Sequence, residues 1–393
     1  MSPEPPAIPP RSWAEINLDA LRHNARIALA RAEGAELMAV VKGDAYGHGL
    51  EHVVPVLAPF ARYFAVASAL EAARVEAILS QTPGGPHPDL FLLGSSLPGE
   101  RQAAAAHGWH LSVSSLEEIQ ACALLGREFG RPVAVHLVAD TGMGRIGFLE
   151  SEFLSAVESA SRHPQLRVAG LATHLPSAAE DEPFTHAQIR RADGLFRAAL
   201  EILPHPVSLH LHNSAALLLF PPRGVQLVRP GLLLYGVSPG SKPEPGLEPV
   251  MSFHTRVTLV RSLPAGHGVS YGRTWIASRP VRVATLGVGY ADGYPRQLSS
   301  SGAEILIGGV RCPLLGRVTM DQIVVDVSSL RPEPRPGDEA ILFGCQGQAS
   351  CPVEEIAFRA GTISWEILTR LTARPPRIPR EQGEFLGQPP LQR

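Results

Sequence analysis

Residues 37–49 read LMAVVKGDAYGHG, an apolar run that leads directly into a lysine and a glycine-rich turn. The run Leu37–Val41 predicts a buried strand, and the glycines after Lys42 predict a sharp turn into a helix. A lysine at the tip of such a strand lies in a pocket, where partial desolvation lowers its pKa toward neutrality. Because only the neutral amine is nucleophilic, Lys42 is a candidate for covalent catalysis, and Tyr46 could reach an anionic group on the ligand. A lysine that merely caps the strand in solvent is the alternative, which the flanking pattern disfavours.

Short apolar runs alternate with helix-type patterns from about residue 12 to residue 235. The expected strands are residues 37–42, 63–67, 89–93, 109–113, 133–138, 166–172, 207–212 and 225–228. Between them, Ser68–Glu71 and Ser114–Glu117 match the capping box that opens a helix. Eight β–α units of this length predict a parallel (β/α)₈ TIM-type barrel over residues 12–240. A doubly wound sheet is the competing arrangement, because periodicity alone does not separate the two.

The sequence pattern changes after the eighth β–α unit. Four prolines between residues 239 and 249 predict a linker at residues 241–250. In the run Phe253–Val260, apolar residues alternate with more polar ones, as in a half-buried strand. Similar runs at 282–288, 303–307, 322–327 and 339–343 predict a mostly antiparallel β domain over residues 251–380. Residues 1–11, with five prolines in the first ten, are expected to form a disordered arm, and residues 381–393 a polar tail.

Composition narrows the class of protein. A chain of 393 residues is too long for one ordinary core, so two domains are expected. The 35 basic and 37 acidic side chains leave a net charge of −2, which offers nothing to recruit nucleic acid or an anionic membrane. The four cysteines form no CxxC pair, and no apolar run approaches the roughly 20 residues of a membrane span. A protein of the reducing cytoplasm is therefore expected.

In a barrel of this kind, catalytic residues gather at the carboxyl ends of the strands. The polar residues at those positions are Lys42, then Asp140, Thr141 and Arg145, then His174, then His210, Asn213 and Ser214, and finally Arg229 with Gly231. Ser214 and the backbone amides near Gly231 would suit a phosphate group. Each residue alone has a structural explanation, such as a core histidine, a helix cap or a surface ion pair. Their joint position at strand ends is what predicts a site.

Two further motifs are weaker. Residues 142–147 match GxGxxG, but a dinucleotide site also needs an acidic residue about 20 positions later, where the chain instead reads Arg162 to Arg167. His210 and His212 lie on one face of the seventh strand and could bind a metal, yet no carboxylate cluster accompanies them. No metal site is therefore expected. In the second domain, Tyr271 lies in a glycine-containing turn, where nearby cations could lower its pKa below about 10 and make it a base.

With these motifs the chain resembles the alanine racemases, which are fold-type III pyridoxal-phosphate enzymes. The resemblance runs from about Trp13 to Pro379. The matching motifs, in order, are residues 39–49, 140–147, 173–174, 210–216, 228–236, 269–272, 289–296, 316–321 and 361–366. Nine motifs in the right order make the resemblance specific. It implies an enzyme that interconverts L-alanine and D-alanine and so supplies D-alanine for peptidoglycan.

The resemblance also implies roles for residues of this chain. Lys42 would hold pyridoxal 5′-phosphate covalently, and Arg229 would face the pyridine nitrogen and keep it unprotonated, which discourages transamination. The other cofactor-binding residues would be Tyr46, His174, Asn213, Ser214, Gly231 and Trp365. The substrate would be contacted by Arg145, Met320, Asp321 and Tyr290. Lys42 and Tyr271 would act as bases on opposite faces of the substrate, with Tyr271 coming from the partner subunit of a homodimer.

Three positions depart from the family pattern. Val138 replaces a lysine whose carbamate orients the arginine in many members, so Arg145 needs another anion, such as chloride or a nearby carboxylate. Trp365 replaces a tyrosine, and Gly43-Asp44 replaces Ala-Asn. These changes leave open a racemase for serine or for a broader set of amino acids. They also motivate a pyridoxal-phosphate-binding protein without turnover as an alternative. A metal-dependent barrel hydrolase is a third alternative.

Overall fold

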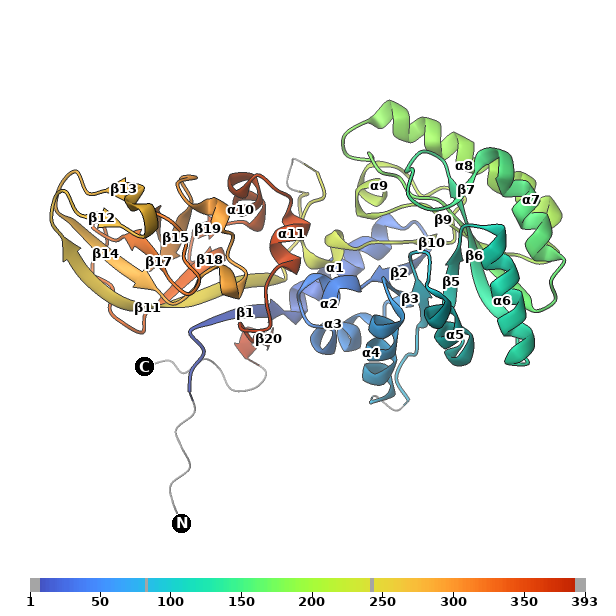
Figure 1. The fold of residues 1–393 in the computed structure, drawn as a ribbon, viewed down its shortest axis with the longest axis horizontal. Coiled ribbons are helices and arrows are strands. Elements are labelled where there is room, and N and C mark those ends of the chain that lie inside the picture. Colours follow the sequence, from blue (N-terminus) through green and yellow to red (C-terminus); the bar gives the residue numbers. More distant parts are fainter. Residues whose placement is uncertain (1–7, 82–83, 241–243, 386–393) are drawn as a thin grey trace, which may run out of the picture. The chain divides into compact units, whose positions relative to one another are not determined.

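The structure is a computed structural model that describes residues 8–81, 84–240 and 244–385. The chain forms two compact units (Figure 1). The first, called the barrel unit, comprises residues 21–45 and 50–248. The second, called the β unit, comprises the residues up to Ala20, residues 46–49 and the chain from Pro249 onward. Among the described residues, no helix combines the length and apolar character that crossing a membrane requires.

The barrel unit is built on one parallel sheet whose order is β10-β2-β3-β4-β5-β6-β8-β9. Its strands are β2 (Glu36–Val40), β3 (Ala61–Val66), β4 (Asp89–Leu92), β5 (His110–Val113), β6 (Val133–Asp140), β8 (Leu166–Ala172), β9 (Ser208–His210) and β10 (Leu227–Val228). A short strand, β7 (Phe148–Leu149), pairs with β6 outside this path. A parallel bridge between Asn213 and Arg229 joins the last two strands and nearly closes the barrel. The expected barrel is confirmed, and the doubly wound sheet is not formed.

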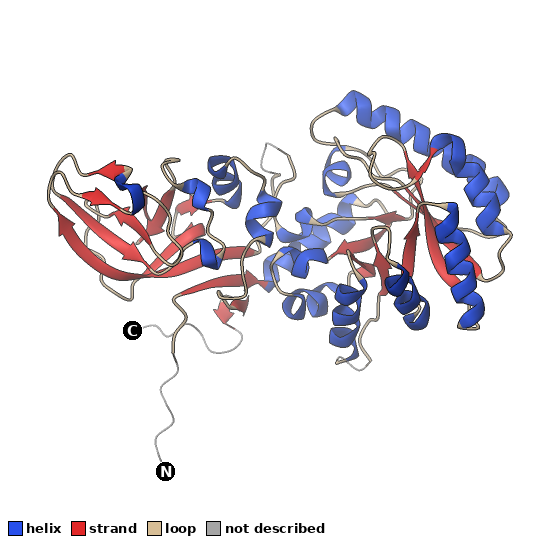
Figure 2. Cartoon of the chain, in the orientation of Figure 1, coloured by secondary structure: helices blue, strands red, loops and turns tan. Residues whose placement is uncertain are grey.

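Helices cover the outside of this sheet (Figure 2). They are α1 (Leu18–Arg31), α3 (Leu50–Leu57), α4 (Ala69–Ser80), α5 (Pro98–His107), α6 (Leu116–Glu128), α7 (Glu150–Ser161), α8 (Glu182–Ile202) and α9 (Ser214–Leu219). The segment α2 (Lys42–Tyr46) is a left-handed turn after β2. Helix α4 begins as expected, because Ser68 accepts the amide of Glu71. Helix α6 begins one residue later than expected, because Ser115 accepts the amide of Glu118.

The β unit contains a ten-stranded sheet of order β19-β18-β15-β16-β17-β14-β11-β1-β20-β21. Its strands are β1 (Ser12–Asn17), β11 (Met251–Leu263), β14 (Val281–Leu286), β15 (Glu304–Ile307), β16 (Val310–Leu315), β17 (Ile323–Asp326), β18 (Glu339–Gln346), β19 (Ala349–Cys351), β20 (Arg377–Glu381) and β21 (Glu384–Phe385). Only the pairing of β1 with β20 is parallel. A hairpin of β12 (Gly268–Val269) and β13 (Trp275–Ile276), with helices α10 (Val353–Ala360) and α11 (Ser364–Thr369), completes the unit. The expected antiparallel β domain is confirmed.

Strand β1 differs from the sequence expectation, which placed residue 12 at the start of the barrel. It pairs with β11 of the β unit, where Trp13 lies opposite His254 and stacks on it with ring centroids 5.2 Å apart. The reason is physical: strand pairing is non-local, so a strand can join a sheet whose other members lie more than 200 residues away. Residues 1–7 of the expected arm, 241–243 of the expected linker and 386–393 of the expected tail lie outside the described residues.

Candidate active site

Lys42 lies at the end of the β2 strand in a left-handed turn. The strand stops at Val40, two residues earlier than expected, and the next regular right-handed helix, α3, starts only at Leu50. Between them, Asp44 and Ala45 both have φ of 54°. Side chains other than glycine pay about 1–2 kcal/mol per residue for this conformation. The turn therefore needs contacts from elsewhere to hold it in place.

Those contacts come from acidic side chains. Glu71 Oε1 accepts the amide of Gly43 at 2.7 Å, and its Oε2 accepts the amide of Ala67 at 2.8 Å. Asp44 Oδ1 accepts the amide of Leu50 at 3.3 Å and pairs with Arg74 at 2.9 Å. In the sequence, Glu71 was assigned only as part of a capping box. Its carboxylate in fact holds the backbone beside the lysine, which no local pattern indicated.

The environment of Lys42 lowers the pKa of its amine. Burial is the largest cause, and the positive charge of Arg145 adds to it, whereas the carboxylate of Glu71 opposes the shift. A lower pKa increases the fraction of neutral amine near neutral pH, and that form is the nucleophile. The expected lowering of the lysine's pKa by partial desolvation is found, and the charge of Arg145 adds a cause that the sequence did not indicate.

Arg229 is the centre of a buried polar cluster after strand β10. Its Nη1 donates to His210 Nδ1 at 2.8 Å and to the His210 carbonyl at 2.7 Å, and its Nη2 donates to the Thr173 carbonyl at 2.8 Å. Nη2 also lies 3.3 Å from Nδ1 of His174. Burial lowers the pKa of Arg229 to about 10, so the guanidinium stays charged at neutral pH. Burial, followed by the charges of Arg229, Arg145 and Lys42, lowers the pKa of His174 to about 3, so that imidazole is neutral.

Ser214 and Gly231 are brought together, as expected from their positions after the last two strands. Ser214 Oγ accepts the amide of Gly231 at 2.9 Å and the amide of Leu233 at 3.3 Å. Asn213 caps helix α9 by accepting the amide of Ala216 at 3.0 Å, and its Nδ2 donates to the Leu175 carbonyl at 2.8 Å. The Ser214 hydroxyl, which keeps its own hydrogen to donate, and the amides of Gly231 and Leu233 thus lie together, and hydroxyl and amide groups of this kind bind phosphate.

The loop after β6 presents Arg145. Asp140 Oδ1 accepts the amides of Gly142 and Met143, each at 2.9 Å, so the loop is organised by a carboxylate of its own chain. Arg145 is exposed, and in the described part of the chain no carboxylate lies within ion-pair distance of it. Val138, at the position of the family's lysine, is buried and offers no anion. The guanidinium is therefore available to an anionic ligand.

Together these residues fit a ligand with an anionic group, a carbonyl and a hydrogen-bond acceptor that faces Arg229. Lys42, Arg145 and Arg229 are cationic, and each is close enough to His174 to lower its pKa. The hydrogen-bond acceptors of Arg229 are neutral carbonyls and imidazoles, so its charge is not cancelled. The amine, the phosphate-type donor set around Ser214 and the buried guanidinium match the aldehyde, the phosphate and the ring nitrogen of pyridoxal phosphate.

The β unit carries the second set of expected site residues, around the loop of residues 316–321. Tyr271 begins a short 3₁₀ turn between β12 and β13, and its side chain is 73% exposed. The residue before it, Ser270, donates from Oγ to the Arg317 carbonyl at 2.7 Å. Gly316 packs so closely against Val269 that an added Cβ would lie 2.7 Å from its carbonyl oxygen. The tyrosine therefore projects from a tightly held turn.

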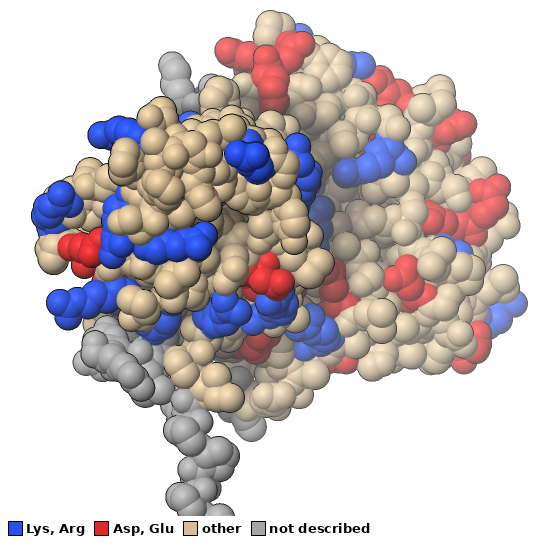
Figure 3. Space-filling model, turned by 60° about the vertical axis from the view of Figure 1, so that its left-hand side comes forward, with Lys and Arg blue, Asp and Glu red and all other residues tan. Residues whose placement is uncertain are grey.

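Met320 and Asp321 belong to this loop, and Tyr290 lies beside it. The amide of Tyr290 donates to the Thr319 carbonyl at 3.0 Å, and the amide of Ala291 donates to the Met320 carbonyl at 3.1 Å. Asp321 pairs with Arg374 at 2.9 Å. Figure 3 shows basic side chains of this unit in several separate groups with acidic ones among them, rather than as one continuous face.

Tyr46 and Trp365 belong to the β unit as well. Tyr46 is 7% exposed, and burial raises the pKa of its phenol to about 12, so it remains a neutral donor. The following residue, Gly47, lies against helix α11, which carries Trp365: a Cβ at Gly47 would lie 2.3 Å from the Leu368 carbonyl oxygen. Only glycine allows this approach, which places the two expected cofactor residues on neighbouring segments.

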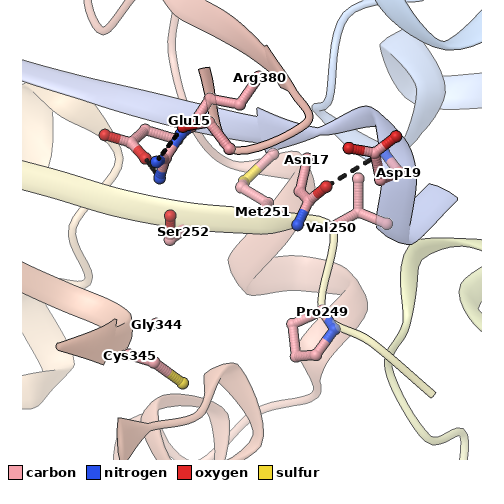
Figure 4. A pocket seen from close by; sticks show the side chains of 11 residues that line it. Glu15, Asn17, Asp19, Pro249, Val250, Met251, Ser252, Gly344, Cys345 and Arg380 are labelled. Carbon is pink, nitrogen blue, oxygen red and sulfur yellow. Dashed lines mark hydrogen bonds and ion pairs between the residues drawn. The ribbon is translucent and has the colours of Figure 1, made fainter. Parts of the chain in front are cut away.

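The β unit also holds a cavity of about 320 Å³ that the sequence did not indicate (Figure 4). Its wall includes Glu15, Arg380 and Cys345. Arg380 Nη1 donates to Glu15 Oε2 at 2.6 Å, and Nε1 of Trp13 donates to Glu15 Oε1 at 3.1 Å. Glu15, His254 and Glu339 lie close enough to share a metal ion, but His254 Nδ1 already bonds Glu339 at 2.7 Å. The cluster is thus a set of internal hydrogen bonds and ion pairs.

Comparisons with known proteins agree with this arrangement. The family model of the alanine racemase N-terminal domain matches residues 16–239, and that of the C-terminal domain matches residues 250–379. The alanine racemase of Symbiobacterium thermophilum is 39% identical over 370 residues, which cover 93% of this chain and 96% of that protein. The chain belongs to the alanine racemase family. It is a racemase that interconverts L-alanine and D-alanine.

Solved alanine racemases have the same fold. The enzyme from Streptomyces coelicolor A3(2) is 38% identical, with a TM-score of 0.86 over 94% of this chain and 98% of that one. The enzyme from Bartonella henselae, solved with covalently bound pyridoxal phosphate, is 28% identical, with a TM-score of 0.83 over 95% of this chain and 100% of that one. The likeness therefore extends through both units.

Within the alanine racemase fold, the weaker sequence motifs have structural explanations. The GxGxxG motif forms the loop around Asp140 rather than opening a helix. His210 uses both ring nitrogens, since Nδ1 receives Arg229 and Nε2 lies 2.8 Å from His136 Nδ1. His210 is therefore committed to hydrogen bonds and has no nitrogen left for a metal. His136 and its neighbour His110 are buried partners that sequence reasoning missed, although strand alternation places both inside the barrel.

Proposed function

We propose that this racemase uses pyridoxal 5′-phosphate held on Lys42, and that Lys42 and Tyr271 are its two bases. The observation that carries the proposal is the setting of Lys42, a half-buried amine whose pKa is lowered by burial and by the charge of Arg145. Burial, with the neighbouring charges of Arg229, Arg145 and Lys42, also lowers the pKa of His174 to about 3, so that its imidazole is neutral. Such a setting favours a nucleophilic amine and attracts an anionic carbonyl compound. The cofactor bound in the Bartonella henselae relative has these properties.

The cofactor would be held by the residues that the family resemblance assigns to it. Lys42 would bind its aldehyde carbon, while Ser214, Tyr46 and the Gly231 amide would bind its phosphate, with Asn213 and Trp365 beside them. His174 would lie on the ring, and Arg229 would face the ring nitrogen. Pyridoxal phosphate, when bound, supplies stabilisation of negative charge at the α-carbon of the amino acid. A guanidinium donates hydrogen bonds and does not release its proton at neutral pH, so Arg229 would leave that nitrogen unprotonated.

The proton transfers would belong to two groups on opposite faces of the substrate. Lys42 Nζ, released when the amino group of the substrate takes its place on the cofactor, would take or return the α-proton on one face, and Tyr271 Oη would do so on the other. Tyr271 is largely exposed in the single chain, together with Ile276, Met320 and Phe358 of the same unit. We propose that a second subunit covers these side chains in a homodimer, and that the tyrosine serves the barrel of that partner.

The substrate carboxylate would bind Arg145, whose guanidinium has no carboxylate partner within the described ranges. Met320, Asp321 and Tyr290 would line the substrate side from the β unit. All four cysteines are unpaired, which fits a reducing compartment, so we propose a cytoplasmic enzyme that supplies D-alanine for peptidoglycan. Trp365 motivates the second candidate, a racemase of wider amino-acid range, and turnover measured across a panel that includes serine decides between them.

The test of the cofactor bond uses an unusual property of the chain: Lys42 and Lys242 are its two lysines. Holoenzyme is reduced with borohydride, digested and analysed by mass spectrometry, beside a Lys242→Arg variant as the matched control. The expected result is one reduced cofactor per chain at Lys42 in both proteins, with loss of alanine racemisation in a chiral assay. Labelling of Lys242, of the amino terminus or of no site would contradict the proposal.

A further inference from the structure

Three buried histidines form a continuous chain through the barrel from Arg229 to Arg167. Arg229 Nη1 lies 2.8 Å from His210 Nδ1, and His210 Nε2 lies 2.8 Å from His136 Nδ1. His136 Nε2 lies 2.9 Å from His110 Nδ1, and His110 Nε2 lies 3.1 Å from Arg167 Nη2. Every ring nitrogen of the three imidazoles is thus in one contact. The rings come from strands β5, β6 and β9, so the chain crosses the barrel interior.

The wall of the barrel leaves room for these three histidine rings. An added Cβ at Gly170, in strand β8, would lie 2.2 Å from Nδ1 of His136 and 2.8 Å from its Cε1. A contact that short excludes every side chain, so glycine alone leaves room for the ring. Phe91 packs on the ring of His136 at 4.6 Å between centroids, and Tyr63 meets the ring of His110 edge-on at 5.1 Å. The rings are held by aromatic contacts as well as by hydrogen bonds.

The three histidines carry one hydrogen more than the contacts between them can hold. A guanidinium has only donors, so Arg229 and Arg167 each fill one terminal contact. The two central contacts, between imidazoles, have room for two hydrogens, whereas three neutral imidazoles bring three. One contact must therefore open. Protonating any ring would make the conflict worse, and burial together with the neighbouring arginines lowers the pKa of all three histidines.

The two ends differ in how firmly they are held. Arg229 is 6% exposed and also donates to the carbonyls of His210 and Thr173, so it is fixed by several bonds. Arg167 is exposed and makes a single hydrogen bond among the described residues, to His110. Arg62, the other cation that lowers the pKa of His110, is ion-paired with Asp89 at 3.0 Å and does not hold Arg167 in place. The contact that opens is therefore the one at Arg167.

We infer that His210, His136 and His110 are positioning residues for Arg229, in a chain whose hydrogen bonds all run from Arg229 toward His110. In this arrangement each ring carries its hydrogen on Nε2 and accepts on Nδ1, and Arg167 turns away so that His110 Nε2–H donates to water. Successive hydrogen bonds polarise one another, so the chain stabilises the buried guanidinium. A carboxylate would do so too, but it would cancel the positive charge that an anionic cofactor requires. This role rests on the proposed function, whereas the direction of the chain does not.

Neutron diffraction from crystals of the deuterated holoenzyme tests the direction directly. The expected result is deuterium on Nε2 of His210, His136 and His110 and on none of their Nδ1 atoms. Deuterium on Nδ1 of any of the three rings, or a doubly protonated ring, would overturn the inference. A protein that did not carry the cofactor on Lys42 would refute the proposed function, yet these six nitrogen positions would still decide the direction of the chain.

Two pairs of variants test the positioning role. His110→Leu removes the acceptor for His136, whereas His110→Asn can keep an oxygen near the position of Nδ1. Loss of the hydrogen-bond partner that orients a metal-bound histidine typically costs 10- to 100-fold. For the analogous support of Arg229 we expect kcat to fall about 10-fold with KM unchanged in His110→Leu, and the absorbance of the bound cofactor to change. Both should recover in His110→Asn. If His110→Leu kept the kcat and the cofactor absorbance of the wild type, the three histidines would only fill the core, and the positioning role would be refuted.

The second pair separates the chain from general overpacking. Gly170→Ala would push His136 out of line, whereas Gly126→Ala creates a similar clash, 2.3 Å from the Gln165 carbonyl oxygen, away from the chain. At equal loss of thermal stability, only Gly170→Ala should change the cofactor absorbance. Arg167→Met should leave kcat within about 2-fold of wild type, because the inferred arrangement has already released that side chain. A larger loss in Arg167→Met would overturn the inference.

Discussion

Glu71 holds the backbone of Gly43 through a hydrogen bond of 2.7 Å, and so fixes the turn that presents Lys42. The same carboxylate raises the pKa of that lysine, against the lowering by burial and by the charge of Arg145. One side chain of helix α4 therefore has a structural effect and an electrostatic effect on the amine of Lys42.

Replacing Glu71 by glutamine should move the titration of Lys42 to lower pH. The carboxylate raises the pKa of the amine, which lies below its ordinary value of 10.5, and an amide carries no charge to do so. The measurement is the rate at which pyridoxal phosphate adds to cofactor-free protein as a function of pH, in a Lys242→Arg background. That rate rises with pH as the amine loses its proton. An unchanged or higher midpoint would show that the carboxylate does not act on the amine.

Replacing Ser214 by alanine should weaken cofactor binding and lower stability together. The hydroxyl accepts the amides of Gly231 and Leu233, and a buried amide without an acceptor costs about 1–3 kcal/mol. Equilibrium dialysis and urea unfolding measure the two effects. Ser115→Ala, which removes the cap of helix α6, is the matched control and should lower stability by about 0.5–2 kcal/mol without changing cofactor affinity. Equal affinity in the two variants would argue against a phosphate site at Ser214.

Replacing Arg145 by methionine should impair substrate binding but not folding. The guanidinium is exposed and has no carboxylate partner in the described part of the chain, so folding loses little when it is removed. Charge-assisted hydrogen bonds contribute about 1.5–3 kcal/mol each, so kcat/KM should fall on the order of 100-fold or more. Steady-state kinetics and a melting curve check both statements. A large loss of thermal stability would mean that Arg145 has a structural partner instead.

Replacing Tyr271 by phenylalanine should cripple racemisation in both directions while the melting temperature stays near that of wild type. The phenol is 73% exposed, so the fold does not depend on its hydroxyl. Removing a general base typically costs about 10²–10⁴-fold. Chiral assays started from L-alanine and from D-alanine measure the loss. Mixing this variant with Lys42→Ala should restore part of the activity if the tyrosine serves the partner subunit, and no recovery would place both bases in one chain.

Much of the fold could be predicted because its signals are local. The apolar run before Lys42 and its seven counterparts predicted the barrel strands in their correct order, with ends displaced by a few residues. The expected grouping of Ser214 with Gly231 also held, because the ends of neighbouring parallel strands meet at one edge. The left-handed turn after Lys42 was not foreseen, since Asp44 and Ala45 adopt positive φ only because distant side chains hold them.

By itself the sequence determined the two-part architecture and the family, and it indicated the residues proposed to carry the chemistry, because periodicity and motif order are properties of adjacent residues. Only the tertiary structure decided that β1 joins the sheet of the β unit, that Glu71 supports the lysine turn, and that His110, His136 and His210 form one chain to Arg229. These contacts join residues tens to hundreds of positions apart. Their geometry follows from how strands and helices pack, which no local pattern records.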